Sequence, residues 1–413
     1  MLLYRLLFGS ALALYAPFAF LRRAAGGKSI GDWRGRMGWT DLPRREGAIW
    51  IHGVSVGEVA AARSIARALR RRGETRPIVL SASTAAGLAR AREAAEADAA
   101  IPFPFDLAWA VDRALEAVDP SLVLLTETEI WPLFLSRCER AGIPVALVNG
   151  RISERSFRHY RAMRPFFRRT LSRISLFAMQ TDDDARRIRA MGAPPERVRV
   201  TGNVKFDLDP PPETYLRSRI REWAGGRKVL VAGSTHEGEE EVLLEALGRI
   251  DPPPLLVIAP RRPERFDAVA GLAARRGLTV SRRSADESGS PDVVVLDTVG
   301  ELAAAYGAAD VAFLGGTLSP VGGHNPIEAW AQGAPTLVGP HVQNIRELIR
   351  RGIQARAAVE VADAGELAAV AGQWLSDDEA RGERSRQARD LVSANRGSAA
   401  AVASVVAGLR KSA

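Results

Sequence analysis

The 413-residue sequence contains little cysteine and little histidine. Its single cysteine, Cys138, excludes a disulfide within the chain and indicates a reducing compartment. Cys138 falls in an expected helix, which favours a packing role over that of a nucleophile. The five histidines are scattered and do not form an obvious set of metal ligands. The sequence therefore predicts neither a disulfide framework nor a metal site.

Common nucleotide-binding motifs are also missing. No GxGxxG follows a predicted strand, so the usual dinucleotide-binding fold is not expected. Residues 25–29, AGGKS, end like a P-loop, but Arg22 stands where that motif needs its first glycine. HEGEE, residues 236–240, has Glu240 where a zinc-binding helix has its second histidine. These absences exclude the commonest nucleotide and zinc sites.

Acidic residues are fewer than basic ones, 48 against 57, which gives a formal net charge of +9. Such an excess indicates an anionic partner, namely nucleic acid, anionic lipid or a phosphorylated substrate, or else a GC-rich genome that favours arginine. No RNA- or DNA-binding motif supports the first partner. Residues 151–173 mix arginines with aromatic residues, so this stretch is either a lipid-binding surface or a solvated helix face kinked at Pro165.

Long hydrophobic runs are confined to the N-terminus. Residues 6–21 are nearly all apolar but include Pro17, and the run falls short of the roughly 20 residues that span a bilayer. Arg22 and Arg23 follow directly, which favours a cytoplasmic position for the rest of the chain. We expect residues 1–24 to form an uncleaved anchor that spans the membrane or lies in its interface. A cleaved signal peptide is the alternative.

The remaining sequence alternates short apolar runs with alanine- and arginine-rich helical stretches. Runs of β-branched residues without alternation are typical of parallel strands buried on both faces. The pattern predicts two doubly wound α/β domains, residues 25–206 and 207–413, that face a cleft, with a proline-rich boundary near residues 207–216. The expected strands lie within residues 48–54, 77–83, 121–127, 143–149, 175–180, 228–234, 254–260, 293–299, 310–316 and 334–340.

Several predicted helices start directly after a strand with a capping pattern. In open parallel sheets this edge holds ligands, and helix N-termini attract anions, so the pattern suits a phosphorylated ligand. The pairs expected to form capping boxes are Ser55 with Glu58, Thr126 with Glu129, Ser234 with Glu237, and Asn325 with Glu328, the last with Pro326 at the first helical position.

The sequence allows two interpretations of the role of Glu58. It is either a helix cap, which contributes about 1 kcal/mol, or a general base that takes a proton from an acceptor hydroxyl. Glu127 and Glu129 are close enough in sequence to raise each other's pKa, but they are also explained as one cap and one surface charge. Lys205 lies near the domain boundary, where a lysine neutralises a leaving phosphate or a substrate carboxylate, or is simply solvated.

Residues 315–330, GGTLSPVGGHNPIEAW, are the least ordinary stretch. Four glycines, Gly315, Gly316, Gly322 and Gly323, predict that the backbone approaches a ligand closely, with a structural turn as the alternative. The helix start after them is suited to a phosphate. Glu328 is expected either to bind a ribose hydroxyl or to cap that helix.

Taken together, these stretches resemble the Kdo transferases, which attach 3-deoxy-D-manno-octulosonic acid (Kdo) to lipid A precursors. The resemblance covers nearly the whole chain after residue 24 and rests on HGVSVGE, ETEIWP, GNVKFD, GSTHEGEE, APRRPERF, DTVGEL and GGHNPIEA, in family order. It implies an inverting GT-B glycosyltransferase that uses CMP-Kdo and no cofactor or metal. It also implies a lipid A precursor, lipid IVA, as acceptor and a place on the cytoplasmic face of the inner membrane.

The resemblance implies a role for particular residues. Glu58 matches the proton acceptor, and Glu127 and Lys205 match positions that support the transition state. Gly53 replaces a serine found in many relatives. The segments that match the CMP-binding positions are Pro260 and Arg261; Val299, Gly300 and Glu301; and Asn325, Pro326, Ile327 and Glu328.

Two other functions remain open at this stage. The same fold carries epimerases and other lipid-linked glycosyltransferases, and the anchor is also compatible with a non-enzymatic membrane scaffold. CMP binding and the effect of changing Glu58 distinguish them.

Overall fold

The computed structural model describes residues 32–40, 45–207 and 215–409. The predicted anchor, residues 1–24, lies outside these ranges. Within them, no helix combines the length and the hydrophobicity that a membrane span requires.

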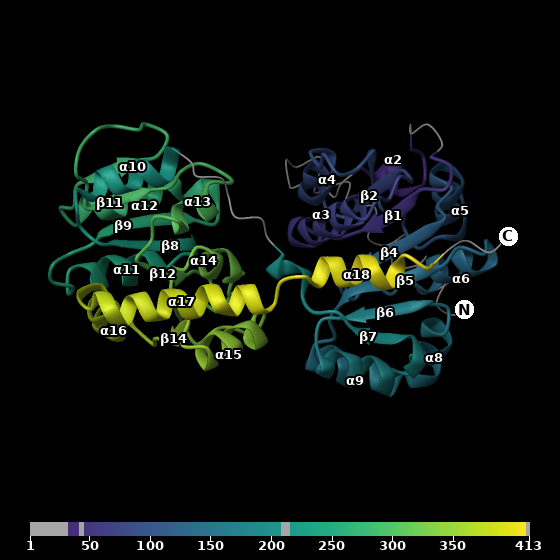
Figure 1. Cartoon of the computed structure of the whole chain (residues 1–413). Helices are drawn as coiled ribbons and strands as arrows, with labels where there is room; N and C mark the ends of the chain where they lie inside the picture. Colours follow the sequence, from purple (N-terminus) through teal and green to yellow (C-terminus); the bar gives the residue numbers. More distant parts are fainter. Residues whose placement is uncertain (1–31, 41–44, 208–214, 410–413) are drawn as a thin grey trace. The chain divides into compact units, whose positions relative to one another are not determined.

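The chain forms two compact units, divided after Asp207 and again after Ala394 (Figure 1). The first unit therefore includes the C-terminal helix α18 (Ser398–Val406), whereas the sequence predicts that residues 207–413 form one domain. The reason is hydrophobic packing, because Val402 and Val406 of α18 are fully buried in a core of the first unit. Asp207 accepts a hydrogen bond from the Gly397 N–H at 2.6 Å and fixes the start of this segment. The structure corrects the predicted end of the second domain.

Each unit contains a parallel seven-stranded sheet. In the first the strand order is β3-β2-β1-β4-β5-β6-β7, and in the second it is β10-β11-β9-β8-β12-β13-β14. The strands of the first unit are β1 (Ile49–His52), β2 (Ile78–Ala82), β3 (Ala99–Pro102), β4 (Leu122–Thr126), β5 (Val145–Gly150), β6 (Leu176–Met179) and β7 (Val198–Val200). Those of the second are β8 (Val229–Thr235), β9 (Leu255–Pro260), β10 (Val280–Arg282), β11 (Val293–Val295), β12 (Val311–Leu314), β13 (Thr336–Val338) and β14 (Ala358–Glu360).

Helices cover both faces of each sheet. Those of the first unit, besides α18, are α2 (Trp33–Arg36), α3 (Val56–Arg71), α4 (Ala85–Arg92), α5 (Ala108–Val118), α6 (Pro132–Arg140), α7 (Glu154–Ala162), α8 (Arg164–Leu171) and α9 (Asp182–Met191). Those of the second are α10 (Tyr215–Ala224), α11 (Glu239–Leu247), α12 (Phe266–Arg275), α13 (Leu302–Tyr306), α14 (Ile327–Ala331), α15 (Arg346–Gln354), α16 (Ala364–Ser376) and α17 (Asp378–Ala394).

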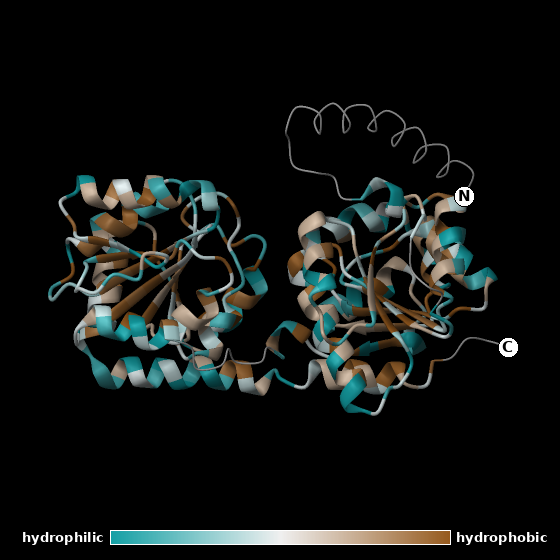
Figure 2. Cartoon of the chain, turned by 90° about the horizontal axis from the view of Figure 1, so that it is seen from above, coloured by the Kyte–Doolittle hydropathy of each residue, from teal (hydrophilic) through white to brown (hydrophobic). Residues whose placement is uncertain are grey.

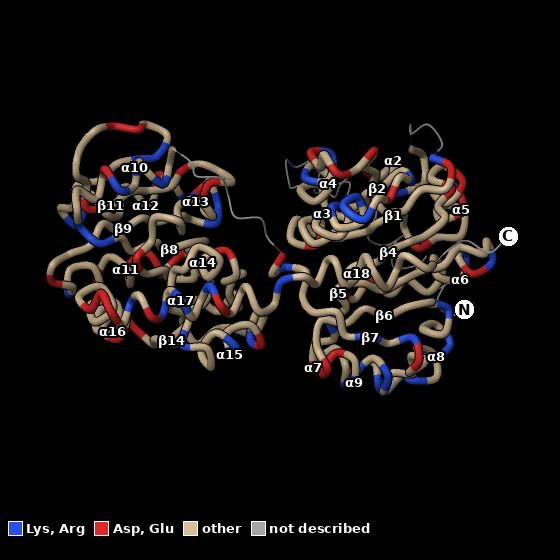
Figure 3. The backbone as a smooth tube through the Cα atoms, in the orientation of Figure 1, with Lys and Arg blue, Asp and Glu red and all other residues tan. Residues whose placement is uncertain are grey.

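Two hydrophobic cores in each unit lie on opposite faces of its sheet. In the first unit, α3, α4 and α18 contribute to one core and α5, α6 and α8 to the other. In the second, α11, α12 and α16 cover one face, and α10, α13 and α14 the other. The strands are mostly hydrophobic (Figure 2), and charged residues lie mainly on helices and loops (Figure 3). This distribution explains why the strands lack a hydrophobic–polar alternation.

Candidate active site

Glu58 lies in the first turn of α3, directly after β1. Its carboxylate accepts hydrogen bonds from the Val54 N–H at 2.8 Å and from the Ser55 hydroxyl at 3.1 Å. Ser55 is the N-cap residue, but its side chain accepts no helix N–H, and Glu58 accepts the N–H of Val54 rather than that of Ser55, so the predicted capping box does not form. Burial raises the pKa of Glu58, and the charge of Glu127 raises it further. Glu58 therefore combines a cap-like contact with the raised pKa of a group able to take up a proton.

Gly53 determines how closely α3 approaches the end of β1. A Cβ atom at this position would lie 2.7 Å from the carbonyl carbon of Glu58 and 2.9 Å from the Val59 nitrogen. Since both neighbours are backbone atoms, any side chain at position 53 requires the first turn of α3 to shift. The absence of a side chain at Gly53 thus bears directly on where Glu58 lies.

Glu127 and Lys205 form an ion pair beside Glu58. Glu127 follows β4 in a left-handed conformation, with φ of 57°, and its carboxylate accepts a hydrogen bond from the Lys205 ammonium at 2.7 Å. The Lys205 segment is fixed by Asn149, whose side-chain oxygen accepts the Val204 N–H at 3.1 Å. The charges of both Glu127 and Lys205 act on the pKa of Glu58, in opposite directions. The structure therefore brings together the three residues that the sequence predicts as catalytic.

Glu129 belongs to the same cluster. Its carboxylate accepts a hydrogen bond from the Trp131 indole N–H at 2.9 Å. Burial, followed by the charge of Glu58, raises the pKa of Glu129 to about 7. The sequence contained a signal for this residue, namely the pair of glutamates in TETEIWP, but interpretation of the motif assigned a site role to Glu127 alone.

The predicted capping box of Thr126 and Glu129 is wrong. Helix α6 begins later, at Pro132, and the buried carboxylate of Asp106 accepts the Leu133 and Phe134 N–H groups at 3.0 and 2.7 Å. A carboxylate from another part of the chain thus caps the helix. Glu129 is left facing the cluster at the carboxyl edge of the sheet, where β1 and β4 are neighbours.

In the second unit, the three segments predicted to bind CMP all follow strands of one parallel sheet, at its carboxyl edge. Pro260 ends β9, and the next N–H, that of Arg261, donates to the Thr235 carbonyl at 3.0 Å. Val299 is 86% exposed. Gly300 has φ of 94°, which favours glycine, and Glu301 accepts a hydrogen bond from Arg283 at 3.2 Å. This edge is where ligands bind in doubly wound folds.

Glu328 lies in the first turn of α14, which begins at Ile327, one residue later than predicted. The N-cap residue is Pro326, and the side-chain oxygen of Asn325, one residue earlier, accepts the first helical N–H, that of Ile327, at 3.2 Å. Burial raises the pKa of Glu328. Among the described residues, none forms a hydrogen bond or ion pair with its carboxylate. Glu328 is therefore not needed as a cap and has its acceptor atoms available.

The glycines of residues 315–323 face other parts of the protein. A Cβ atom on Gly315 would lie 2.2 Å from the Ser234 carbonyl oxygen, and one on Gly322 would lie 2.4 Å from the Asn344 side chain. At Gly315 and Gly322 these contacts support the alternative of a structural turn. Both glycines are needed for close packing of the loop against its neighbours.

Two histidines meet beside this loop. The Nε2 atoms of His236 and His324 are 2.9 Å apart. Burial, then the charge of Arg261, lowers the pKa of His324 to about 4.

The predicted capping box of Ser234 and Glu237 is wrong, because helix α11 begins only at Glu239. Within the described ranges, no group of three or more His, Cys, Asp or Glu side chains is arranged to hold a metal ion.

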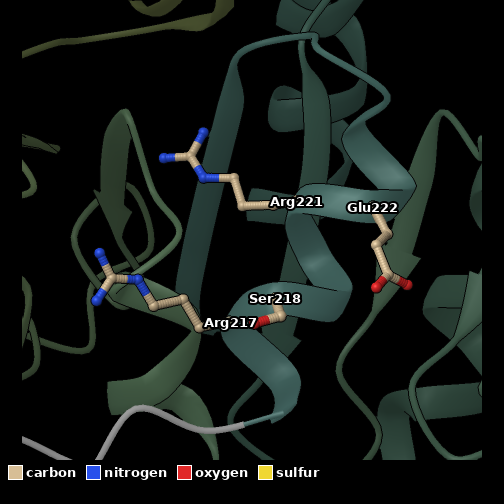
Figure 4. Close-up of a pocket in the computed structure, with 4 residues that line it drawn as sticks. All are labelled: Arg217, Ser218, Arg221 and Glu222. Carbon is tan, nitrogen blue, oxygen red and sulfur yellow. The ribbon is translucent and has the colours of Figure 1, made fainter.

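A shallow pocket on α10 does not coincide with these residues. It is lined by Arg217, Ser218, Arg221 and Glu222 (Figure 4). Arg221 is paired with Asp310 at 3.1 Å, and Glu222 with Arg219 at 2.8 Å. The pocket contains none of the predicted site residues.

Comparison with known proteins identifies the family. Residues 31–208 match the family model of 3-deoxy-D-manno-octulosonic-acid transferase (kdotransferase). The 3-deoxy-D-manno-octulosonic acid transferase of Bordetella pertussis is 37% identical to the chain over 94% of this chain and 95% of that protein. The chain belongs to the Kdo transferase family. The Haemophilus influenzae Kdo transferase is 34% identical over 88% of this chain and 87% of its own length.

Solved structures support the fold of this Kdo transferase. A UDP-GlcNAc 2-epimerase from Neisseria meningitidis matches with a TM-score of 0.60 and 14% identity, over 87% of this chain and 98% of its own. The glycotransferase of kitacinnamycin matches with a TM-score of 0.55 and 17% identity, over 89% of this chain and 100% of its own. The two parallel-sheet α/β units are thus GT-B-like. Family membership makes the chain a glycosyltransferase of lipopolysaccharide biosynthesis, and the likeness to the epimerase is one of fold alone.

Proposed function

We propose that this Kdo transferase moves Kdo from CMP-Kdo to a lipid A precursor, lipid IVA, with inversion at the anomeric carbon. The observation that carries the proposal is the half-buried Glu58, whose pKa is raised and which lies beside the Glu127–Lys205 pair. The Kdo transferase family supplies the chemistry in which such a carboxylate acts.

In this mechanism Glu58 is the general base. Its carboxylate accepts the proton of the acceptor's hydroxyl, and the oxygen attacks the anomeric carbon of Kdo from the side opposite the phosphate. The bond between that carbon and the phosphate oxygen breaks, and CMP leaves with the electron pair. A raised pKa suits the base, because proton transfer is most efficient when the pKa approaches the working pH.

Lys205 and Glu127 are proposed to support the transition state. Lys205 supplies a positive charge held in place by Glu127, and a preorganised charge stabilises charge that develops during the reaction. The Glu127 carboxylate holds the lysine ammonium through their hydrogen bond. A negative charge in the same cluster also stabilises oxocarbenium character at the anomeric carbon.

The second unit is proposed to hold the donor. The segments are Pro260 and Arg261, Val299 to Glu301, and Asn325 to Glu328, all at one sheet edge. Arg261 suits an anionic donor, and the carboxylate of Glu328, which has no partner in the described part of the chain, suits ribose hydroxyls. CMP is a monophosphate leaving group, which needs less charge neutralisation than a diphosphate. The mechanism is therefore proposed to need no cofactor.

We also propose that the protein works at the cytoplasmic face of the inner membrane. Residues 1–24 are the expected anchor. Helices α7 and α8 add a basic surface, on which Arg158, Arg161, Arg164, Arg168 and Arg169 are exposed. The aromatic residues of this stretch pack against a core, and the helical stretch is interrupted at Met163, just before Pro165 in the first turn of α8. Exposed arginines suit contact with anionic headgroups.

The test is transfer by the purified protein. CMP-Kdo and lipid IVA are expected to give a product heavier by one or more Kdo residues, with an anomeric configuration opposite to that of the donor. Mass spectrometry and NMR of the product measure both, and UDP-sugars serve as control donors. Transfer from a UDP-sugar and none from CMP-Kdo would contradict the proposal.

A further inference from the structure

Glu239, the first residue of α11, is a buried charge with an unusual set of partners. Its side chain is only 1% exposed. Five backbone N–H groups donate to its carboxylate, those of His236 at 2.9 Å, Gly316 at 2.7 Å, Thr317 at 2.9 Å, Leu318 at 2.9 Å and Ser319 at 3.2 Å. Such a dense set of donors compensates for the loss of water around the charge.

The four consecutive N–H groups of residues 316–319 form a concave anion site. Successive backbone N–H groups of this kind hold phosphates and other anions in many proteins. Here the protein's own carboxylate fills the site. A donor phosphate therefore cannot use these amides, although the glycine-rich sequence suggests a phosphate-binding loop.

The loop that Glu239 holds leads directly into a proposed donor-binding segment. The Gly322 and Gly323 N–H groups donate to the Gly316 carbonyl at 3.0 and 2.7 Å, which ties the end of the loop to its start. On the other side, Glu239 accepts the N–H of His236, whose ring meets that of His324. His324 immediately precedes Asn325. The Glu239 carboxylate thus holds the start of the loop directly. It also holds the backbone of His236, whose ring contacts His324 at the end of the loop.

We propose that Glu239 is a positioning residue for donor binding, which occupies the anion site of residues 316–319 and holds residues 315–328 in the conformation that binds the CMP part of the donor. This inference rests on the proposed function, in which Asn325 to Glu328 bind CMP. The carboxylate itself does not touch the donor.

The first test needs no donor. Glu239→Gln keeps the size of the side chain but replaces one acceptor oxygen with an amide group that faces N–H donors. Hydrogen exchange, followed by mass spectrometry of the full-length protein, is expected to show exchange in residues 315–328 at least about tenfold faster, since hydrogen bonds to a charged group are lost. Glu237→Gln is the matched control, because Glu237 is 88% exposed two residues away. Unchanged exchange in folded Glu239→Gln protein overturns the proposal.

The second test measures CMP affinity by calorimetry and the KM for CMP-Kdo. Glu239→Gln is expected to weaken both by about tenfold or more, with a smaller effect on kcat, and Glu237→Gln to leave both unchanged. Glu239→Asp, which keeps the charge, is expected to fall between Glu239→Gln and the wild type. Equal losses in the Asp and Gln variants overturn the proposal. Absence of CMP binding in the wild-type protein contradicts the donor assignment instead, while the exchange experiment still decides the role of Glu239.

A third variant covers the case in which Glu239→Gln does not fold. Glu239→Ala leaves the anion site empty, and formate is small enough to replace the missing carboxylate. Added formate is expected to restore CMP affinity and to slow exchange in residues 315–328, and chloride serves as an ionic-strength control. Rescue by neither anion, with the variant folded, contradicts the anion-site role.

Discussion

At the scale of single residues, Glu58 is the sharpest test of the proposed mechanism. Glu58→Gln is nearly isosteric, and its amide oxygen still accepts the Val54 N–H, so we expect the fold and CMP affinity to be retained. Turnover should fall by roughly 10²-fold or more, the usual effect of losing a general base. Steady-state transfer assays with CMP calorimetry as the control measure this. A folded variant with near wild-type turnover would leave Glu58 as a helix cap.

Glu328 tests the donor site in the same way. Because its half-buried carboxylate has no partner among the described residues, Glu328→Gln removes no contact that holds the protein together. We expect unchanged or slightly higher thermal stability, and CMP binding weaker by about 1–3 kcal/mol if the carboxylate accepts ribose hydroxyls. Differential scanning fluorimetry and calorimetry separate the two effects. CMP affinity equal to that of the wild type would remove Glu328 from the donor site.

The raised pKa of Glu129 predicts that the stability of the protein depends on pH. Its pKa rises from 4.5 to about 7 on folding, chiefly through burial, so between these values the folded state binds more protons than the unfolded state. The stabilisation is fully present below about pH 4.5 and is lost as the pH rises through 7. Glu129→Gln cannot lose a proton, so the decrease in unfolding free energy over this window should be smaller. Urea unfolding at several pH values measures this decrease. If the unfolding free energy depends on pH equally in Glu129→Gln and the wild type, the raised pKa of Glu129 is contradicted.

At the scale of secondary structure, all ten strands expected from the sequence are present, and the four that were missed are the sheet edges β3, β7, β10 and β14. The physical reason is burial. Central strands are covered on both faces and read as continuous apolar runs, whereas β7 and β14 contain exposed residues and are only three residues long. Continuous apolar runs in the sequence indicate strands that are buried on both faces, so they do not identify strands that are partly exposed.

The candidate site was predictable to a different degree. Glu58, Glu127 and Lys205 were identified through motif resemblance. Glu58 and Glu127 follow the neighbouring strands β1 and β4, whereas Lys205 follows the edge strand β7 and reaches Glu127 only because Asn149 holds its segment. The capping partners were not predictable, because Asp106 caps α6 from a distant part of the chain. Glu239 was missed for the same reason, since its partners lie about 80 residues away, in a loop whose glycines suggested a ligand.

Helix α18 covers part of one face of the sheet in the first unit, and its contribution to stability can be tested. Val402 is fully buried against the first unit, and Ser404 on the same helix is exposed. Val402→Ala is expected to lower the free energy of unfolding of the first unit by about 1–3 kcal/mol, while Ser404→Ala should have little effect. Urea unfolding reports the loss, and CMP affinity of the second unit is the internal control. A loss confined to CMP binding would contradict the assignment of α18.

At the scale of the whole molecule, the chain leaves the first unit after Asp207 and returns to it after Ala394. The second unit is therefore an insertion between β7 and α18, and its hydrophobic cores contain only its own residues. The first unit, in contrast, needs a segment that follows the second unit in the sequence. Removing residues 395–413 should damage the unit that carries Glu58, although they are farthest from it in sequence.

This arrangement predicts how separated fragments behave. Residues 208–394 are expected to fold alone and to bind CMP with nearly the affinity of the full chain. Residues 208–413, nearly the same as the domain 207–413 expected from the sequence, carry in addition the apolar face of α18. Its residues Ala399, Val402, Ala403 and Val406 then lack the core that buries them. Exposed apolar surface of this kind promotes association, so the longer fragment should aggregate or elute as an oligomer. Size-exclusion chromatography and calorimetry of the two fragments test this. A monomeric, well-folded 208–413 fragment and an unstable 208–394 fragment would show that α18 stabilises the second unit instead.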